Sequence, residues 1–167
     1  MAPDDEFLKQ FNEYFAHREE ALPDELEERR ARELNEKEVK VEGVYEHPRG
    51  AFVLLRDVNG RRMPIWIGQA EALSISLALE GNGPPRPLTH DLLKRVLDET
   101  GATIEAALVD DLYSNTYYAK LTLRRNGSSV DIDCRPSDAI AMALRTKSPI
   151  YVADHVLEEA QVEWHEE

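Results

Sequence analysis

The sequence predicts an α+β fold: a mixed or antiparallel sheet from a duplicated unit of three strands and one helix, with helices packed on it. Two observations lead to this fold class. A strand–turn–strand–helix pattern occurs twice between about residues 38 and 147. An ungapped shift of 67 positions then brings Asn59-Gly60 onto Asn126-Gly127 and aligns the segments on either side of them.

The first copy of the unit contains three strands and a helix. The strands are expected at about residues 39–45, 51–57 and 61–67, and the helix at 69–80. Asn59-Gly60 indicates a hairpin turn between the last two strands, because both residues tolerate a positive φ. The apolar residues of the helix point several ways around its axis, so we expect it to be heavily buried.

The second copy follows a connecting helix. Thr89 is the expected N-cap of that helix, which covers residues 90–100 and stops at Gly101. Asn126-Gly127 predicts the second hairpin, and Pro136 suits the first turn of the last helix in the unit. The expected elements are strands at 103–112, 116–125 and 128–135, a helix at 136–145, a short strand at 149–152 and a final helical stretch.

The two copies agree most clearly at apolar positions. Met63, Ile65 and Ile67 align with Val130, Ile132 and Cys134, and in each set the residues alternate along a strand. Side chains two apart share one face of a strand, so both sets are expected to face the core.

Outside the repeat, the chain divides by charge. Residues 1–36 carry 12 acidic and 5 basic side chains, a net of −7, and predict an acidic helical arm with helices over 4–20 and from Asp24 to about Glu36. Aromatic residues spaced along the first helix form a stripe that requires a partner surface. We expect either docking on the domain at residues 37–160 or self-association into a homo-oligomer. Residues 161–167 are expected to form a tail.

Composition narrows the class of protein. The formal net charge of −13 repels a phosphate backbone at long range, so binding to nucleic acid would need a local basic patch or a bridging metal. No apolar run reaches the roughly 18–20 residues that span a bilayer, and the acidic start does not resemble a signal peptide. A single cysteine excludes an intrachain disulfide, and we expect a cytoplasmic location. Glycine-rich phosphate loops, CxxC pairs and HExxH are missing from the sequence, so no organic cofactor is expected.

Asp131 and Asp133 are the first candidates for chemistry. They alternate with apolar residues, so both project from one strand face, where two carboxylates can share a hard ion such as Mg²⁺ or Mn²⁺. Arg135 continues that face and suits a phosphate. The alternative is a solvated strand face with an Asp–Arg ion pair.

His90 and Asp91 form the second candidate site, close after Arg86. A histidine titrates near neutrality, an arginine binds phosphate, and a helix N-terminus attracts anions, so this segment could supply a general base and a phosphate clamp. The alternative is a capping loop with a surface histidine.

Glu71 and Asp138 occupy equivalent positions in the two copies, near the third residue of each helix. A carboxylate there compensates the free backbone N–H groups and the helix dipole, which explains both residues without catalysis. The functional alternative is that the repeat brings two acidic groups towards one cleft. Trp66 could stack on a base or be an ordinary packing residue.

Three segments resemble the signature blocks of the bacterial bifunctional nuclease domain, in order and spacing, over about residues 38–160. They are PIWIGQAEA at Pro64–Ala72, RPLTHDLL at Arg86–Leu93 and DIDCRPSDAIA at Asp131–Ala141. The resemblance implies cleavage of both DNA and RNA, which we expect to be assisted by Mg²⁺ or Mn²⁺. The expected catalytic residues are Arg86, His90, Asp91, Arg135 and Asp138, and the expected metal ligands are Asp131, Asp133 and Glu71. The alternative function is a non-catalytic binding or regulatory module that acts through assembly with itself or a partner.

Overall fold

The computed structural model describes residues 35–163. The predicted helix over residues 4–20, with its aromatic stripe, lies outside the described residues, as do residues 164–167. The second predicted helix does not reach Glu36. Asn35 has a φ of 47°, which is left-handed, and the first strand begins two residues later.

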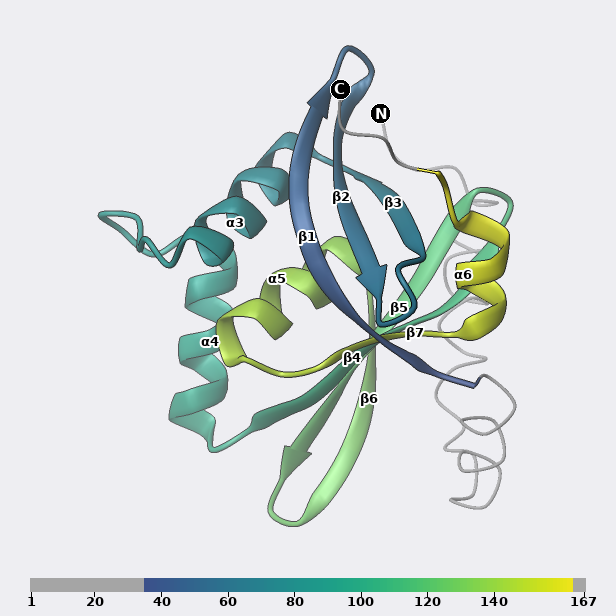
Figure 1. Cartoon of the computed structure of the whole chain (residues 1–167). Coiled ribbons are helices and arrows are strands. Elements are labelled where there is room, and N and C mark those ends of the chain that lie inside the picture. Colours follow the sequence, from purple (N-terminus) through teal and green to yellow (C-terminus); the bar gives the residue numbers. More distant parts are fainter. Residues whose placement is uncertain (1–34, 164–167) are drawn as a thin grey trace, which may run out of the picture. The chain divides into compact units, whose positions relative to one another are not determined.

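Between residues 35 and 163 the chain forms seven strands and four helices, which confirms the α+β class (Figure 1). The strands are β1 (Lys37–His47), β2 (Gly50–Asp57), β3 (Arg62–Ile67), β4 (Thr103–Tyr113), β5 (Thr116–Arg125), β6 (Ser128–Cys134) and β7 (Ile150–Val152). The helices are α3 (Gln69–Glu80), α4 (Thr89–Thr100), α5 (Pro136–Thr146) and α6 (Asp154–Ala160).

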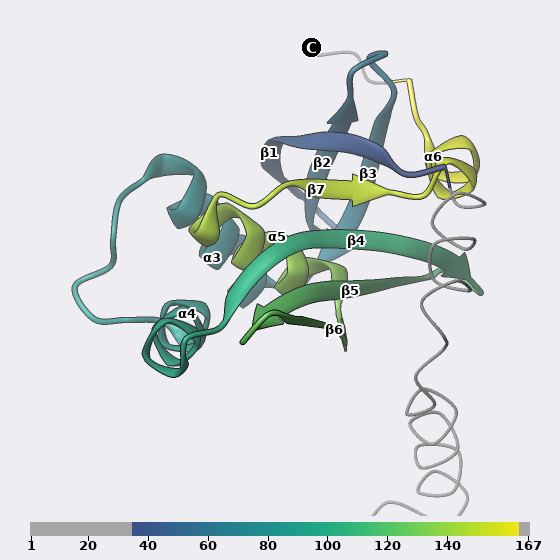
Figure 2. The same ribbon diagram turned by 90° about the horizontal axis from the view of Figure 1, so that it is seen from below.

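All seven strands form one mixed sheet in the order β3-β2-β1-β7-β4-β5-β6. The β4–β7 pair is parallel and the other pairs are antiparallel. Each predicted copy of the unit is therefore an antiparallel meander followed by a helix, and the two meanders extend outwards from β7. In Figure 2 the two halves of the sheet diverge on either side of β7, and α5 lies in the angle between them. The shared topology agrees with a duplication, which itself stays a prediction.

The two predicted hairpin turns differ in length. Asn126 and Gly127 alone join β5 to β6, and both have positive φ, 52° and 78°. That is the geometry of a primed two-residue turn. Between β2 and β3 the loop has four residues, and Gly60, with a φ of 86°, is the residue in it with positive φ. The turn is longer because Asp57 also binds backbone and side chain of Arg61.

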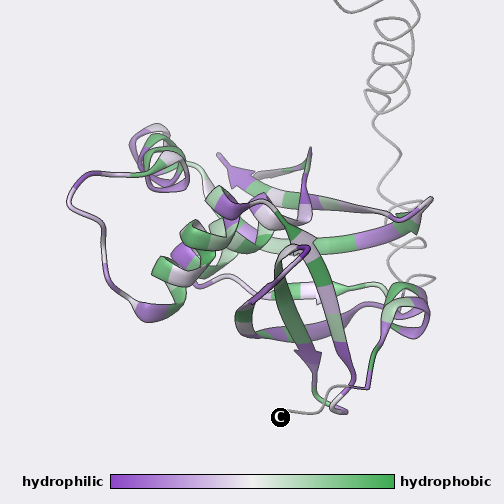
Figure 3. Cartoon of the chain, turned by 90° about the horizontal axis from the view of Figure 1, so that it is seen from above, coloured by the Kyte–Doolittle hydropathy of each residue, from purple (hydrophilic) through white to green (hydrophobic). Residues whose placement is uncertain are grey.

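The core lies between the inner face of the sheet and α5. Residues Ala139–Ala143 of α5 are almost completely buried against Val53 and Leu55 of β2 and Val109 of β4. Hydropathy colouring shows hydrophobic residues concentrated at the centre of the domain and hydrophilic residues at the loops and hairpin tips (Figure 3). Burial of this apolar surface is the main term that fixes α5 on the sheet.

Two expectations about burial are wrong. Helix α3 is not heavily buried, because Leu73 and Leu79 are 56% and 41% exposed. In β6, Val130 and Ile132 are 57% and 43% exposed, although their counterparts in β3 are buried. The sheet ends at β6, so this strand has a partner on one side alone and its apolar face is incompletely covered.

The ends of several elements also differ from expectation. Helix α4 begins at Thr89 with Leu88 as its N-cap, so Thr89 is not the cap. After α6 the chain returns to the sheet, where the Val162 N–H donates to the Arg62 carbonyl at 2.8 Å. Residue 162, which was expected in a tail, therefore extends the β3 edge. No helix in the described part of the chain is long and apolar enough to cross a membrane.

Candidate functional site

The N-termini of α3 and α5 bring Glu71 and Asp138 together on one guanidinium group. Arg135 is the residue before α5, and its Nη2 lies 2.9 Å from Glu71 Oε1 and 3.1 Å from Asp138 Oδ1. Its Nε donates to Asp138 Oδ2 at 2.8 Å, so the contact with Asp138 is bidentate. The two equivalent carboxylates of the repeat thus meet at one guanidinium group, and the predicted cleft between them stays a prediction.

His90, at the N-terminus of α4, joins the same group. Its Nε2 lies 2.8 Å from Asp138 Oδ1, and its Nδ1 lies 2.7 Å from Ser74 Oγ on α3. The imidazole is 9% exposed, so the predicted surface histidine of the capping-loop alternative is wrong. Both ring nitrogens are occupied by protein groups. We call Glu71, Ser74, His90, Arg135 and Asp138 the His90 cluster.

The charge state of Asp138 follows from its partners. The hydrogen bond from His90, reinforced by Arg135, lowers the pKa of Asp138 to about 2, although burial opposes this shift. Asp138 is therefore ionised at neutral pH and accepts hydrogen bonds. His90 must carry a hydrogen on Nε2 to donate to it, and Nδ1 of the neutral ring then accepts the Ser74 hydroxyl hydrogen. The hydrogen bonds that Arg135 donates to Asp138 and Glu71 also raise the pKa of Arg135, which stays positive.

Asp91 does not join the His90 cluster directly. Its Oδ2 accepts the backbone N–H of Leu88 at 2.9 Å, which closes the first turn of α4. Its Oδ1 accepts from Arg145 Nε at 2.8 Å, and Arg145 also donates to the Ser74 carbonyl. Burial alone would raise the pKa of Asp91, but these bonds from Arg145 and Leu88 outweigh it and lower the pKa. Asp91 and Arg145 clamp α4 against α3 and α5 and so hold His90 in place.

The other predicted residues lie apart from the His90 cluster. Arg86 is exposed in the loop before α4, and no hydrogen bond or ion pair joins it to another described residue. Asp131, on the edge strand β6, accepts from Thr122 Oγ1 at 2.7 Å and pairs with Lys120 at 3.1 Å. Asp133 lies opposite Lys120 in the strand register. Arg135 therefore turns away from this strand face to Asp138 and Glu71.

The predicted metal ligands do not fit a single ion. Within residues 35–163, no three His, Cys, Asp or Glu side chains are grouped so that they could hold a metal. Glu71 binds Arg135, whereas Asp131 binds Lys120, so these carboxylates serve different cations. Asp131, Asp133 and Glu71 thus do not form one ligand set.

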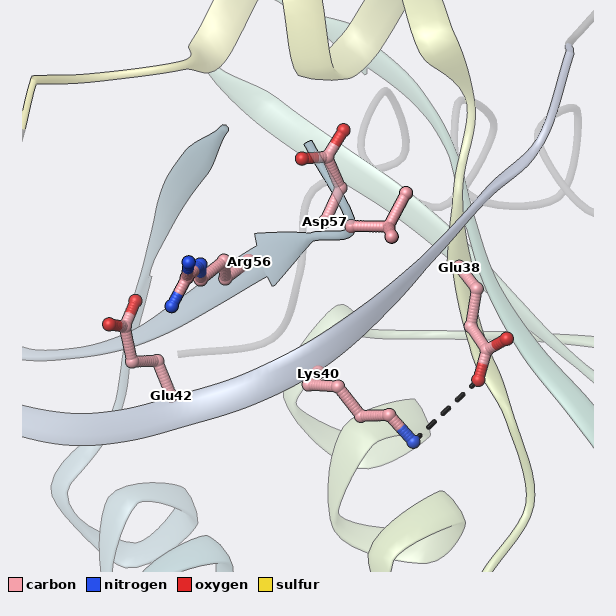
Figure 4. A pocket seen from close by; sticks show the side chains of 6 residues that line it. Glu38, Lys40, Glu42, Arg56 and Asp57 are labelled. Atoms are coloured by element: carbon pink, nitrogen blue, oxygen red, sulfur yellow. Dashed lines mark ion pairs between the residues drawn. The ribbon is translucent and has the colours of Figure 1, made fainter. Parts of the chain in front are cut away.

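A hollow of about 610 Å³ on β1 and β2 is separate from these residues (Figure 4). It is lined by Glu38, Lys40, Glu42, Arg56, Asp57 and Val58, and none of the predicted site residues is among them. Lys40 and Glu38 form an ion pair at 3.7 Å, which Figure 4 marks. Three acidic and two basic side chains line this hollow, so it offers no concentrated positive charge for a phosphate.

Ser74 and Arg145 were missed by the sequence analysis. Ser74 is 3% exposed within an otherwise apolar stretch, and a polar residue at a buried helical position was the available signal. Arg145 near the end of α5 reads as an ordinary complement to the helix dipole, and no local pattern marks its contact with Asp91.

Cys134 is excluded as a nucleophile, because burial raises the pKa of its thiol to about 12.

Comparison with known proteins agrees with the three sequence blocks. The model of the bifunctional nuclease domain matches residues 53–165. An uncharacterized protein of Mycobacterium tuberculosis is 45% identical over 126 residues, which cover 74% of this chain and 75% of that protein. Bifunctional nuclease 1 of Arabidopsis thaliana is 31% identical over 109 residues, and that of Oryza sativa subsp. japonica is 28% identical over 109 residues. These residues are 63% of this chain but 34% and 33% of the two plant proteins. The chain belongs to the bifunctional nuclease domain family.

Proposed function

We propose that this protein is a nuclease that hydrolyses phosphodiester bonds in DNA and RNA, with the His90 cluster at its reaction centre. One observation carries the proposal. Arg135 is 64% exposed at its side chain, yet it is held at a fixed place by two carboxylates next to a buried histidine. A guanidinium presented in this way suits a phosphate, which it can bind through two parallel hydrogen bonds.

Transfer of Arg135 to a substrate phosphate would activate its former partner. In the free protein Asp138 is a weak proton acceptor, because its pKa is about 2. Arg135 is one cause of this low pKa, and its departure, together with the approach of an anionic phosphate, raises the pKa. A carboxylate with a higher pKa accepts a proton more readily from the attacking water. The water oxygen then bonds to phosphorus as its proton passes to Asp138, and the bond to the leaving oxygen breaks. The leaving oxygen takes up a proton from solvent water, and Asp138 afterwards releases its proton to solvent.

His90 has a different role in this proposal from the general base that the sequence suggested. Both of its ring nitrogens are hydrogen-bonded within the protein, and the ring is buried. It therefore orients Asp138 through the hydrogen bond from its Nε2, and the Asp91–Arg145 clamp positions it. Arg86, exposed close before α4, would contact a phosphate at the outer end of the site.

Assistance by Mg²⁺ or Mn²⁺ stays a prediction from the family resemblance. Glu71 and Asp138 are the acidic pair nearest to the proposed reaction, and both are bound to Arg135. No step above depends on a metal ion, so the metal requirement is a separate question for the assay.

The test is cleavage of labelled single-stranded DNA, duplex DNA and RNA in Mg²⁺, in Mn²⁺ and in chelator. We expect Asp138→Asn, Arg135→Gln and His90→Ala each to lower the rate by roughly 100-fold or more, because they remove the proton acceptor, the phosphate-binding cation and the group that orients Asp138. Asp98→Asn is the matched control, because Asp98 is an exposed carboxylate paired with Lys94 on α4. It should cleave like the wild type.

Equal rates for all these variants would place the activity in a contaminant or in another part of the chain. Cleavage that survives chelator and still depends on Asp138 would support the metal-free sequence of steps. Cleavage in Mn²⁺ or Mg²⁺ alone would instead show that an ion takes part.

The alternative is a cytoplasmic, non-catalytic binding module that assembles with itself or a partner. Exposed apolar side chains favour it: Leu92 and Val96 on α4 are 58% and 48% exposed, and Val130 and Ile132 add to them on the open edge strand β6. The net charge of −13 also opposes binding of nucleic acid. No cleavage under any of the conditions above, combined with stable self-association, would favour this alternative.

A further inference from the structure

Trp66 is a large exposed aromatic residue that the proposed reaction does not use. It is the second-last residue of strand β3 and is 52% exposed, whereas its neighbour Ile65 lies in the core and is 2% exposed. Alternation along the strand therefore points the indole to the face of the sheet opposite to Ile65. A tryptophan side chain gains stabilisation when it is buried. One that the fold leaves half exposed therefore offers apolar surface to a binding partner.

Two neighbouring rings contact the indole at steep angles and hold it in place. Phe52, its partner on β2, lies 5.3 Å away between ring centroids at an interplanar angle of 60°. His47, at the tip of the β1–β2 hairpin, lies 5.5 Å away at 78°. The His47 ring is fixed in turn, because its Nδ1 accepts the backbone N–H of Arg49 at 3.2 Å. Neither ring stacks flat on the indole, and Trp66 is still 52% exposed with both in place, so part of it is open to a stacking partner.

Arg49 supplies a positive charge beside this surface. It is exposed at the same hairpin tip, one residue before Gly50, and forms no ion pair with another described residue. Arg62, on the strand of Trp66, is by contrast paired with Glu42. An unpaired cation next to a half-open indole matches the two parts of a nucleotide, its phosphate and its base.

We propose that Trp66 is a stacking platform for one base of single-stranded DNA or RNA, with Arg49 binding an adjacent phosphate. The inference rests on the proposed nuclease function and specifies that its substrate is single-stranded rather than duplex. Bases inside a duplex are stacked on each other, whereas an unpaired base has a free face for the indole. A protein partner fits less well, because the exposed neighbours Glu46, His47 and Arg49 are polar and such a contact favours a contiguous apolar patch.

Along the chain, Trp66 is followed closely by Glu71, a member of the His90 cluster. Strand β3 ends one residue after Trp66, and Glu71, which binds Arg135, lies in the first turn of the helix that follows. A strand held at Trp66 would therefore pass the end of β3 where the proposed reaction occurs.

The test measures binding of the full chain to fluorescently labelled oligo-dT and oligo-U by anisotropy in chelator. Trp66→Ala should weaken binding by about 5- to 150-fold, as expected for loss of one base stack, and Trp66→Phe by less. The control Tyr113→Ala removes another exposed aromatic residue and should not change the affinity. Arg49→Ala should weaken binding and flatten its salt dependence, whereas Arg125→Ala at the β5–β6 hairpin should not.

An oligonucleotide of abasic residues separates stacking from other effects. The wild type should lose as much affinity for it as Trp66→Ala loses for oligo-dT, and Trp66→Ala should lose nothing further. Wild-type affinity in Trp66→Ala, or no binding of single strands by the wild type, overturns the proposal. So does a change in the sedimentation mass of Trp66→Ala without oligonucleotide, which would make Trp66 a contact between copies of the chain. Trp66-dependent binding without cleavage would instead overturn the nuclease proposal alone, and Asp138-dependent cleavage without Trp66-dependent binding would overturn the platform alone.

Discussion

Glu71 Oε1 and Asp138 Oδ1 lie within hydrogen-bonding distance of the same nitrogen, Nη2 of Arg135, at 2.9 Å and 3.1 Å. The two carboxylates occupy equivalent positions in the repeat, and each lies in the first turn of its helix. Their helix-terminal role and their shared cation are therefore compatible. Neither helix has a side-chain cap hydrogen bond, so the bonds shown for these carboxylates go to other side chains. The packing of α3 on α5 explains why the two carboxylates meet.

Acid should remove the stabilisation that Asp138 provides. Its pKa is lowered to about 2 from an ordinary value of 3.8, so its contribution is complete above a pH of about 4 and is lost as the pH falls to about 2. The full shift corresponds to about 2.5 kcal/mol, and we expect about 1–2 kcal/mol because the side chain is partly exposed. Urea unfolding at a series of pH values should show this loss in the wild type and not in Asp138→Asn. An equally steep acid loss in that variant would contradict the assignment, and Asp98→Asn serves as the exposed control.

Replacing Arg145 should destabilise the contact between α4 and its neighbours. Its side chain is 7% exposed, and its removal leaves Asp91 and the Ser74 carbonyl without their partner. We expect Arg145→Met to cost about 2–4 kcal/mol in the free energy of unfolding. The double variant with Asp91→Asn should cost less than the sum of the single variants, because the stranded carboxylate is then gone. Arg95→Met, at an exposed position of α4, is the control, and strict additivity would argue against the clamp.

Ser74→Ala should affect the histidine rather than the core packing. The change removes the hydroxyl that lies 2.7 Å from His90 Nδ1 and leaves a buried acceptor unsatisfied, at a cost of about 1–3 kcal/mol. Nitrogen NMR of the imidazole should show hydrogen on Nε2 in both wild type and variant, because Asp138 holds that tautomer. A hydrogen on Nδ1 in the neutral ring of the wild type would contradict the proposed direction of both bonds.

Gly68→Ala should displace Glu71 from Arg135. A methyl group at this position would collide with the end of the Glu71 side chain, which is flexible enough to move away. The fold should therefore keep its stability to within about 1 kcal/mol, as for a surface change, while cleavage falls if Glu71 positions Arg135. Gly83→Ala is the matched control, because nothing lies near the added methyl group there. Unchanged cleavage in Gly68→Ala would remove Glu71 from the reaction centre.

Self-association is expected to depend on the segment before β1. Its predicted helix carries an aromatic stripe, Phe7, Phe11 and Phe15, that needs a covering surface. Deleting residues 1–34 should lower the number of subunits measured by sedimentation, and Phe11→Ala should weaken the assembly. If the number of subunits is unchanged in the shortened chain, the contact lies elsewhere, and Ile132→Lys on the open edge strand becomes the next variant.

Features with a local cause could be predicted from the sequence alone. The primed turn at Asn126-Gly127 follows from the φ preferences of two adjacent residues, and α3 and β5 have the predicted bounds. The family could also be identified, because each of its three signature blocks is an unbroken run of residues in the sequence. Even the burial of β3 followed from alternation, although the same pattern in β6 did not lead to burial.

Tertiary structure decided which of the candidate residues act together. His90 and Asp138 are 48 residues apart, and Arg135 and Glu71 are 64 apart, so their contacts depend on how α3, α4 and α5 pack. From the sequence alone, Asp131 and Asp133 were as good candidates for the site as Asp138. The register of β6 places them opposite Thr122 and Lys120 instead. Residue type and spacing determine the local backbone conformation and the face of the helix or strand on which a side chain lies. The partner that a polar side chain meets is set by long-range burial of apolar surface, which the local sequence does not encode.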